Sequence, residues 1–182
     1  YPQINNKEIV ERIGQLEKEY GLLDPAICLK IAEEIALEKF CKFENRMQAI
    51  DAGVRVAFAY ITLSVVSSPI EGLTEIKIFK TKKGEEYFCP YYSGPIRSAG
   101  GTGAAFSLVI IDYLREFFGF AKYDPTEEEI KRSVTEIFDY HERVTNLQYF
   151  PTEEEILYLA KNIPIQIGGE PSEKFEVSNF KV

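Results

Sequence analysis

The stretch of sequence that decides the fold is Tyr-Tyr-Ser-Gly-Pro-Ile-Arg-Ser-Ala-Gly-Gly-Thr-Gly-Ala-Ala, residues Tyr91–Ala105. Its glycines, proline and small polar residues are typical of a loop. Two runs with the period-2 alternation of strands precede it, Leu73–Lys80 and Glu86–Tyr92. An apolar helix follows, from Ala104 to about Phe118, and Gly119 closes it. We predict a helix-rich α+β fold in which a small antiparallel strand pair leads through a glycine-rich loop into a helix.

The region before the strands has helical periodicity throughout. We predict three helices there: from a cap at Asn5 or Asn6 up to Gly21, from Asp24-Pro25 toward Phe40, and from about Glu44 to Val66, where Ser67-Ser68-Pro69 stops the helix. On the third helix, the charged residues Arg46, Asp51 and Arg55 are expected to face outward.

Two later helices begin with the same hexapeptide, Pro-Thr-Glu-Glu-Glu-Ile, at Pro125–Ile130 and Pro151–Ile156. Each start offers a capping box, formed by Thr126 with Glu129 and by Thr152 with Glu155. Nothing beyond the hexapeptide recurs, so we interpret the two copies as well-made helix starts rather than as a repeat.

The tail is expected to form a β-hairpin with arms at Ile163–Gly168 and Phe175–Phe180. We divide the chain into an N-terminal helical region (residues 1–68), a mixed α/β region (69–162) and the start of a hairpin (163–182) that continues into a longer protein.

Composition sets broad limits on the protein class. The 182 residues are 45% hydrophobic and 27% charged, which is enough for a folded core and excludes a disordered or low-complexity chain. Net charge is −8, so the chain cannot bind nucleic acid through bulk charge. The three cysteines, Cys28, Cys41 and Cys89, include no CxxC pair and suggest a reduced, cytoplasmic setting. No segment reaches the length of a membrane span, and no membrane partner is expected.

The glycine-rich loop is the main candidate for chemistry. A helix start presents unpaired amides and a positive dipole end, and glycines let a phosphate approach the backbone. Two side chains add hydroxyl donors and one adds a guanidinium, so the candidate phosphate-binding residues are Arg97, Ser98, Gly100, Gly101 and Thr102. The loop lacks the lysine of a P-loop and the spacing of a dinucleotide fingerprint. The alternative is a tight turn whose small residues let the helix pack against the sheet.

The only locally basic part of the chain surrounds this loop. Residues 72–122 contain seven Lys or Arg and five Asp or Glu, a net charge of +2, which leaves −10 for the rest. This segment is therefore the candidate for meeting an anion. The alternative for Lys80–Lys83 is that these lysines protect a strand edge from aggregation.

Other reactive residue types do not combine into a catalytic centre. His141, the only histidine, is expected at the surface or in helix packing rather than as a catalytic base. The acidic triplets 127–129 and 153–155 could hold Mg²⁺, but capping already explains them. The aromatic run in the second strand is expected to place some rings in the core and to leave others for base stacking: Tyr87, Phe88, Tyr91 and Tyr92.

The loop signature resembles that of one family, the large subunit of archaeal family D DNA polymerase. The match covers Tyr91–Ala105, is strong from about Ala49 onward, and departs from the usual pattern at Gly103, where the family often has Ala or Gln. Similar segments flank it at Asp51–Ala57, Ile70–Leu73, Tyr123–Glu129, Tyr140–Arg143, Asn146–Pro151, Asn162–Ile165 and Gly169–Glu173.

This resemblance implies a replicative DNA-directed DNA polymerase, a nucleotidyltransferase that works on DNA primer–template with Mg²⁺. It also implies a partner, a small subunit with 3′–5′ exonuclease activity, and a cytoplasmic place of work at the nucleoid. The family's metal-binding aspartates and cysteine-rich zinc modules match no position here, so we expect no catalytic residue and no cofactor in this region.

Three hypotheses remain for the region itself. The first is an accessory scaffold whose loop contacts DNA phosphate. The second is a protein-interaction module for subunit assembly or self-association, including a homodimer, without DNA contact. The third is an independent nucleotide-binding enzyme that uses the glycine-rich loop, which the missing P-loop lysine disfavours.

Overall fold

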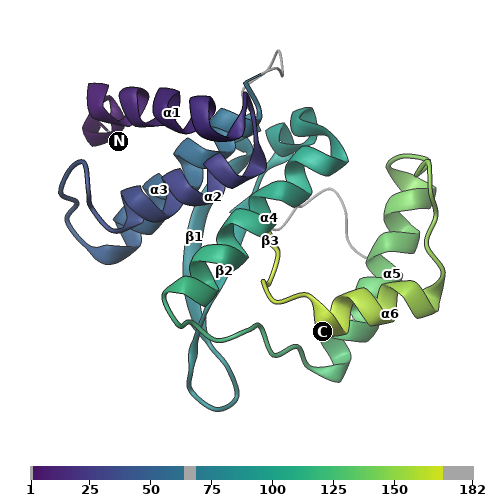
Figure 1. Cartoon of the computed structure of the whole chain (residues 1–182). Coiled ribbons are helices and arrows are strands. Elements are labelled where there is room, and N and C mark those ends of the chain that lie inside the picture. The colour runs from purple at the N-terminus through teal and green to yellow at the C-terminus, as the bar shows by residue number, and fades with distance from the viewer. Residues whose placement is uncertain (1, 64–68, 170–182) are drawn as a thin grey trace.

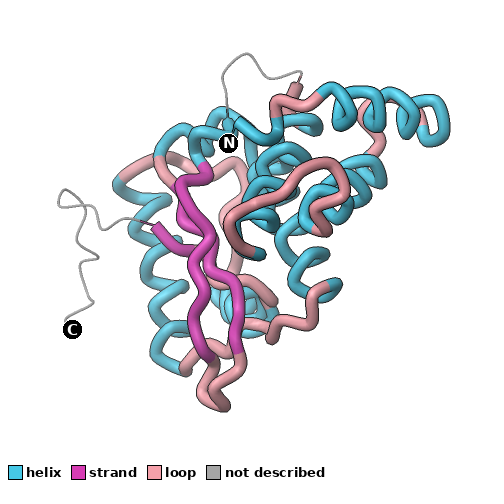
Figure 2. The backbone as a smooth tube through the Cα atoms, turned by 90° about the vertical axis from the view of Figure 1, so that its left-hand side faces the viewer, coloured by secondary structure: helices cyan, strands magenta, loops and turns pink. Residues whose placement is uncertain are grey.

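A computed structural model describes residues 2–63 and 69–169 of the chain, with the side chains of Pro69, Arg97 and Ser98 outside that description. Helices α1 to α4 gather on one side of a small sheet, and a second helix pair stands beside them (Figures 1 and 2). The elements, in chain order, are η1 (Pro2–Ile4), α1 (Lys7–Tyr20), α2 (Pro25–Ala36), α3 (Arg46–Ile61), η2 (Pro69–Gly72), β1 (Leu73–Lys80), β2 (Glu86–Tyr92), η3 (Gly94–Ala99), α4 (Gly100–Phe117), α5 (Glu127–Arg143), α6 (Glu153–Asn162) and β3 (Gly168–Gly169), where η marks a 3-10 helix. The predicted α+β class is confirmed.

The first three helices begin where their capping residues predict. The Asn6 side chain accepts from the Glu8 N–H, the Asp24 side chain from the Ala26 N–H, and the Asn45 side chain from the Gln48 N–H. Helix α2 ends at Ala36, short of Phe40, because Glu38 turns the chain with a left-handed φ of 56°. Helix α3 ends at Ile61, and the predicted continuation over residues 64–66, like the stop at 67–68, lies outside the described residues.

The core lies between these helices and one face of the sheet. Its largest fully buried side chains come from α1, α2, α3, α4 and both long strands: Leu16, Ile27, Ile31, Ile35, Ile50, Phe58, Leu73, Phe88, Ile110, Ile111 and Leu114. Helices α2 and α3 cross closely, because a Cβ on Gly53 would lie 2.5 Å from the Ala32 carbonyl oxygen. The three cysteines are free, and burial raises the pKa of the Cys28 thiol to about 12.

The sheet has the order β1-β2-β3. Strands β1 and β2 form the expected antiparallel pair, with Leu73 opposite Tyr92 and Lys80 opposite Glu86. In the described part of the tail, the strand is Gly168–Gly169, which pairs in parallel with the end of β2, and residues 163–167 form no strand. The second hairpin arm at 175–180 lies outside the described residues.

Both faces of β2 are covered, which corrects one expectation. Tyr87 to Pro90 are consecutive buried residues. Phe88 packs on Phe120 in the core, with ring centroids 4.3 Å apart. On the other face, Tyr87 packs on Tyr123 and its hydroxyl donates to the Gln166 Oε1. Tyr87 is therefore not available for base stacking, because residues that follow far along the chain close over it.

Both predicted capping boxes are present, at the starts of α5 and α6. At α6 the Thr152 Oγ1 accepts from the Glu155 N–H at 3.3 Å, and the Glu155 carboxylate accepts from the Thr152 N–H at 2.8 Å. That hydrogen bond and a second from the Tyr149 hydroxyl lower the pKa of Glu155.

Substitution of this cap gives a first prediction. Thr152→Ala should lower the free energy of unfolding of α6 by about 1 kcal/mol, since the N3 amide loses its acceptor. Native-state hydrogen exchange of the α6 amides measures this loss, and Thr145→Ala, on an exposed loop threonine, is the control. Because the pKa of Glu155 is lowered in the folded state, its contribution to stability is fully present above the ordinary carboxyl pKa. That contribution is lost as the pH falls through the lowered pKa of the folded state. Equal protection of α6 in the variant and the control would contradict the prediction.

Candidate nucleic-acid interface

The glycine-rich segment is held firmly at the point where it leaves β2. The Tyr92 hydroxyl and the Ser107 Oγ lie 2.8 Å apart, which ties the strand end to α4. Burial raises the pKa of Tyr92 to about 12, so the phenol stays protonated at neutral pH. The backbone of Ser93 donates to the Gly72 carbonyl at 2.8 Å, and Ile96 donates to Ser93 at 3.1 Å.

Gly72 fixes the position of the segment by close packing. A Cβ on Gly72 would lie 2.2 Å from the Ile96 nitrogen and 2.4 Å from its Cα. Real Cβ atoms do not approach backbone this closely, so η2 and η3 can pack in this way only with glycine at position 72.

The segment is a 3-10 helix rather than an open loop, which corrects the predicted helix start at Ala104. Helix η3 occupies Gly94–Ala99 and runs directly into α4 at Gly100, where φ is +70°. In a 3-10 helix each amide bonds to the carbonyl three residues earlier, so part of the donors expected at the helix start are used internally. The closing position is as predicted: α4 ends at Phe117, and Gly119 follows with φ +74°.

Three of the five predicted site residues form an open surface at the start of α4. Gly100, Gly101 and Thr102 are exposed, and a Cβ on either glycine would meet no atom within 4 Å. The N-cap residue Ala99 supplies no side-chain hydrogen bond. The other two predicted residues, Arg97 and Ser98, have backbone within η3, but their side chains lie outside the described part of the structure.

Two basic residues of the middle segment, Lys77 and Lys82, are paired with other groups along the sheet. Lys82 lies at the far end of the strand pair, and seven residues of β2 at about 3.3 Å each separate it from the segment by roughly 20 Å. There its ammonium lies 3.7 Å from the Asp124 carboxylate. The Lys77 ammonium pairs with Glu75 and lies over the Tyr91 ring, 3.9 Å from its centroid. These two lysines therefore have acidic or aromatic partners on or beside the sheet.

His141 has a packing role, as expected. Its Nδ1 accepts from the Leu147 N–H at 3.0 Å, and its ring stacks on Phe150 with centroids 4.3 Å apart. The backbone bond requires Nδ1 to be unprotonated.

The acidic triplets do not fit a magnesium site. Glu129 and Glu155 accept the cap hydrogen bonds, and the described residues contain no group of three or more His, Cys, Asp or Glu that could hold a metal ion. The described helices do not meet the requirements for a membrane span. None of them combines the length and apolarity needed to cross a bilayer.

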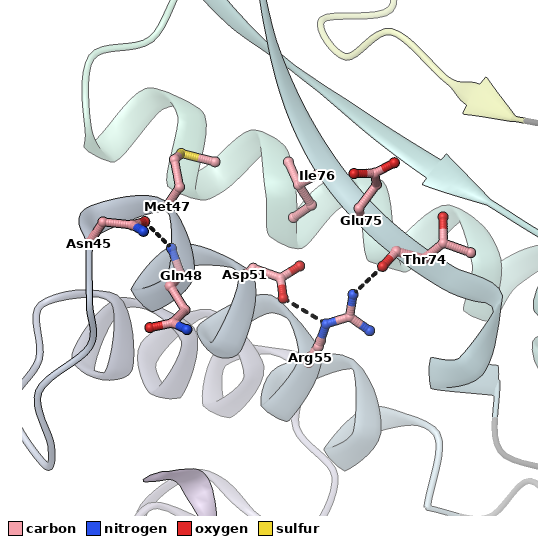
Figure 3. A pocket seen from close by; sticks show the side chains of 8 residues that line it. All are labelled: Asn45, Met47, Gln48, Asp51, Arg55, Thr74, Glu75 and Ile76. Carbon is pink, nitrogen blue, oxygen red and sulfur yellow. Dashed lines mark hydrogen bonds and ion pairs between the residues drawn. The ribbon is translucent and has the colours of Figure 1, made fainter. Parts of the chain in front are cut away.

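A buried ion pair next to the segment was placed wrongly from the sequence. Asp51 and Arg55 do not face outward: Asp51 is 7% exposed, and the Arg55 Nε donates to its carboxylate at 2.7 Å (Figure 3). The same guanidinium donates to the carbonyls of Leu73 and Thr74 at 2.7 and 2.8 Å. Arg55 thus links α3 to the first residues of β1, directly after Gly72. We call Asp51, Arg55 and the carbonyls of Leu73 and Thr74 the clamp.

A shallow groove of about 300 Å³ adjoins this clamp, between α3 and β1. Figure 3 shows the residues that line it: Asn45, Met47, Gln48, Asp51, Arg55, Thr74, Glu75 and Ile76. One sequence signal could have located the clamp. Helix α3 is apolar around most of its circumference from Ala49 onward, and such a helix is largely buried, which favours burial of a charged residue such as Asp51 within it.

Comparison with known proteins agrees with the signature in residues 91–105. A family model described as "DNA polymerase II large subunit DP2, N-terminal" matches residues 2–182. Among curated relatives, the DNA polymerase II large subunit of Nanoarchaeum equitans is 46% identical over 181 residues, all of this chain and 15% of the relative. The large subunit of Thermococcus kodakarensis is 41% identical over 96% of this chain and 10% of its own length, and that of Archaeoglobus fulgidus is 43% identical over 98% and 15%.

This chain spans only a small part of the length of these relatives. The family model matches nearly all of it, and the identity is above 40% across the full match. The chain belongs to the archaeal family D group of DNA polymerase II large subunits, of which it is the N-terminal region.

Proposed function

We propose that this region is a non-catalytic scaffold of a replicative DNA-directed DNA polymerase, and that its glycine-rich segment contacts a DNA backbone phosphate. Arg97, Ser98, Gly100, Gly101 and Thr102 are the contacting residues. The observation that carries the proposal is the open backbone surface at Gly100–Thr102, exposed on a segment that Gly72 and Ser107 hold in place.

The physical basis is local, because the chain as a whole is acidic. A phosphate can reach backbone amides where no Cβ stands in the way, and the positive end of the α4 dipole favours an anion there. The open surface is preorganised by packing, so binding costs little conformational entropy. One guanidinium in the same turn is enough for a single bidentate phosphate contact.

The complete polymerase lies mostly outside this region. On this proposal, the whole large subunit adds nucleotides to a primer with Mg²⁺ held elsewhere, and a small subunit supplies 3′–5′ exonuclease activity. The assembly works at the chromosome in the cytoplasm. The segment positions DNA for that chemistry and is inactive alone.

Arg97→Ala tests the phosphate contact in the two-subunit complex. Binding of labelled primer–template across a salt series should show lower affinity and a slope of log K against log salt reduced by about 0.9, the value for one lost phosphate contact. Arg132→Ala, which changes an exposed arginine on α5, should leave the slope unchanged. An unchanged slope for Arg97→Ala would remove the phosphate role.

Gly101→Ala separates DNA contact from stability. Since the new Cβ meets no atom and the φ of Gly101 is not positive, alanine fits the folded backbone and restricts the unfolded chain. This variant should therefore raise the free energy of unfolding by about 0.4–1 kcal/mol. It should still weaken primer–template binding several-fold, because the methyl group stands where the phosphate approaches. Gly14→Ala on α1 also adds a Cβ in open space, so it should stabilise similarly and leave DNA binding unchanged. Equal DNA affinity of the two variants would argue against the interface.

Subunit assembly or self-association without DNA contact is the alternative function. Light scattering with size-exclusion chromatography, with and without the small subunit, distinguishes it. Two results together would favour this alternative: a larger measured mass when the small subunit is added, and DNA binding of Arg97→Ala equal to that of the wild type.

A further inference from the structure

Residues 123–162 form a helical arm, made of α5, α6 and their connection, beside the main body (Figure 1). The arm is fixed at its base. The Tyr123 N–H donates to the Pro164 carbonyl at 2.9 Å, so the chain leaves and rejoins the body at the same place. Just before it, the Ala121 N–H donates to Glu86 on β2 at 2.8 Å.

The arm leaves several large apolar side chains exposed. On its two helices, Ile130 and Ile156 are the buried residues. Six large apolar or aromatic residues of the arm are exposed: Phe138, Val144, Tyr149, Phe150, Tyr158 and Leu159. Tyr158 is 68% and Leu159 62% exposed, on adjacent positions of α6. Two helices alone cannot bury their apolar faces, and several large exposed apolar side chains on one small element are typical of an interaction site.

The far end of the arm is ordered by specific contacts. Phe138 meets Phe150 edge to face with centroids 4.8 Å apart, and the His141 ring stacks on Phe150. The Tyr149 hydroxyl donates to the Glu155 carboxylate at 2.8 Å. These contacts hold the rings of Phe138, Tyr149 and Phe150 in place, which favours a preformed docking surface at this end of the arm.

The arm also has a strongly negative net charge. Residues 123–162 contain ten Asp or Glu and four Lys or Arg, a net charge of −6 against −8 for all 182 residues. A surface that covers the arm is therefore apolar at its centre and bordered by Lys or Arg.

We infer that the arm docks against another part of the same large subunit, at an apolar surface with a basic border. The chain covers 10–15% of the relatives described above, so most of the polypeptide to which the arm is joined lies outside the matched region. A covalently joined surface meets the arm at an effective concentration in the millimolar range, far above that of a separate protein. This inference rests on family membership and does not depend on DNA contact.

Photocrosslinking in the full-length large subunit tests the inference without DNA. A benzophenone amino acid replaces Tyr158, or Leu22 as the control, which is 77% exposed on the loop between α1 and α2. The Tyr158 position should crosslink to a peptide of the same subunit outside residues 1–182, with a yield unchanged by dilution, since the contact is intramolecular. Its yield should exceed that of the Leu22 position several-fold.

Other crosslinking results would overturn the inference. They are crosslinks to the small subunit when it is added, crosslinks between two copies that disappear on dilution, or equal yields at positions 158 and 22. Leu159→Glu provides a second measurement, because it places a charge on the surface of α6 without disturbing Ile156. It should increase hydrogen exchange in the crosslinked peptide, whereas Leu22→Glu should not. If the phosphate proposal is wrong, Arg97→Ala leaves the salt dependence of DNA binding unchanged. The crosslinking and hydrogen-exchange results would still be as expected here, so the two failures can be told apart.

Discussion

Gly72→Ala should lower the free energy of unfolding of the 182-residue chain by about 3 kcal/mol, the upper end of the range for overpacking. The added Cβ would lie 2.2 Å from the Ile96 nitrogen and 2.4 Å from its Cα. Backbone atoms cannot rotate away as a side chain can, so η2 and η3 must separate. Separation also breaks the bond from the Ser93 N–H to the Gly72 carbonyl. Urea denaturation followed by circular dichroism measures the change.

A glycine on the neighbouring helix provides the control. Gly94 lies in η3, and a Cβ there meets no atom within 4 Å. Gly94→Ala should therefore change stability by less than about 0.5 kcal/mol. Equal denaturation midpoints for the two variants would show that η2 and η3 do not pack as described. If the packing is right, Gly72→Ala should also weaken DNA binding, because it displaces the segment that carries Gly100–Thr102.

Arg55→Ala should cost about 3 kcal/mol, since it leaves the 7%-exposed Asp51 without its guanidinium. It also removes the donors that the Leu73 and Thr74 carbonyls accept from. Arg55→Lys should recover only part of the loss, because one ammonium cannot reproduce the planar fork that serves a carboxylate and two carbonyls. Urea denaturation again gives the free energies.

An exposed ion pair of the same spacing serves as the comparison. Arg132 and Glu136 are an i,i+4 pair on α5 with both side chains more than 40% exposed. Arg132→Ala should cost less than about 0.5 kcal/mol, as expected for a pair in water. The double variant Asp51→Asn with Arg55→Met should lose less than the sum of the single changes, since neither buried charge is left behind. Additive losses would indicate that Asp51 and Arg55 act independently.

The candidate site was only partly predictable from the sequence. The signature marked Gly100, Gly101 and Thr102, and the structure places these residues at an exposed helix start. The basic charge around the signature was correctly counted, but its position depends on strand length and on partners such as Asp124 for Lys82. The pairing of those side chains is a long-range contact, which composition does not reveal.

Local sequence determined the starts of the helices and the strand pair. A cap such as Asn6, Asp24 or Thr152 accepts from amides two or three residues away, so neighbouring residues in the sequence are enough to predict it. The same holds for β1 and β2, whose alternation and short turn lie within 20 residues of sequence, 73–92.

Only the tertiary structure decided which side chains are covered and which stay exposed. The sequence predicted that Asp51 and Arg55 face outward, but Asp51 is buried and Arg55 half-buried, because β1 packs on α3 and its first two carbonyls accept from Arg55. The second face of β2 is covered by Tyr123 and Gln166, which come from beyond α4 and α6. The arm's apolar side chains stay exposed because no described element packs over them. Burial depends on contacts between residues far apart in the chain, and periodicity within one element shows which face is apolar without showing what covers it.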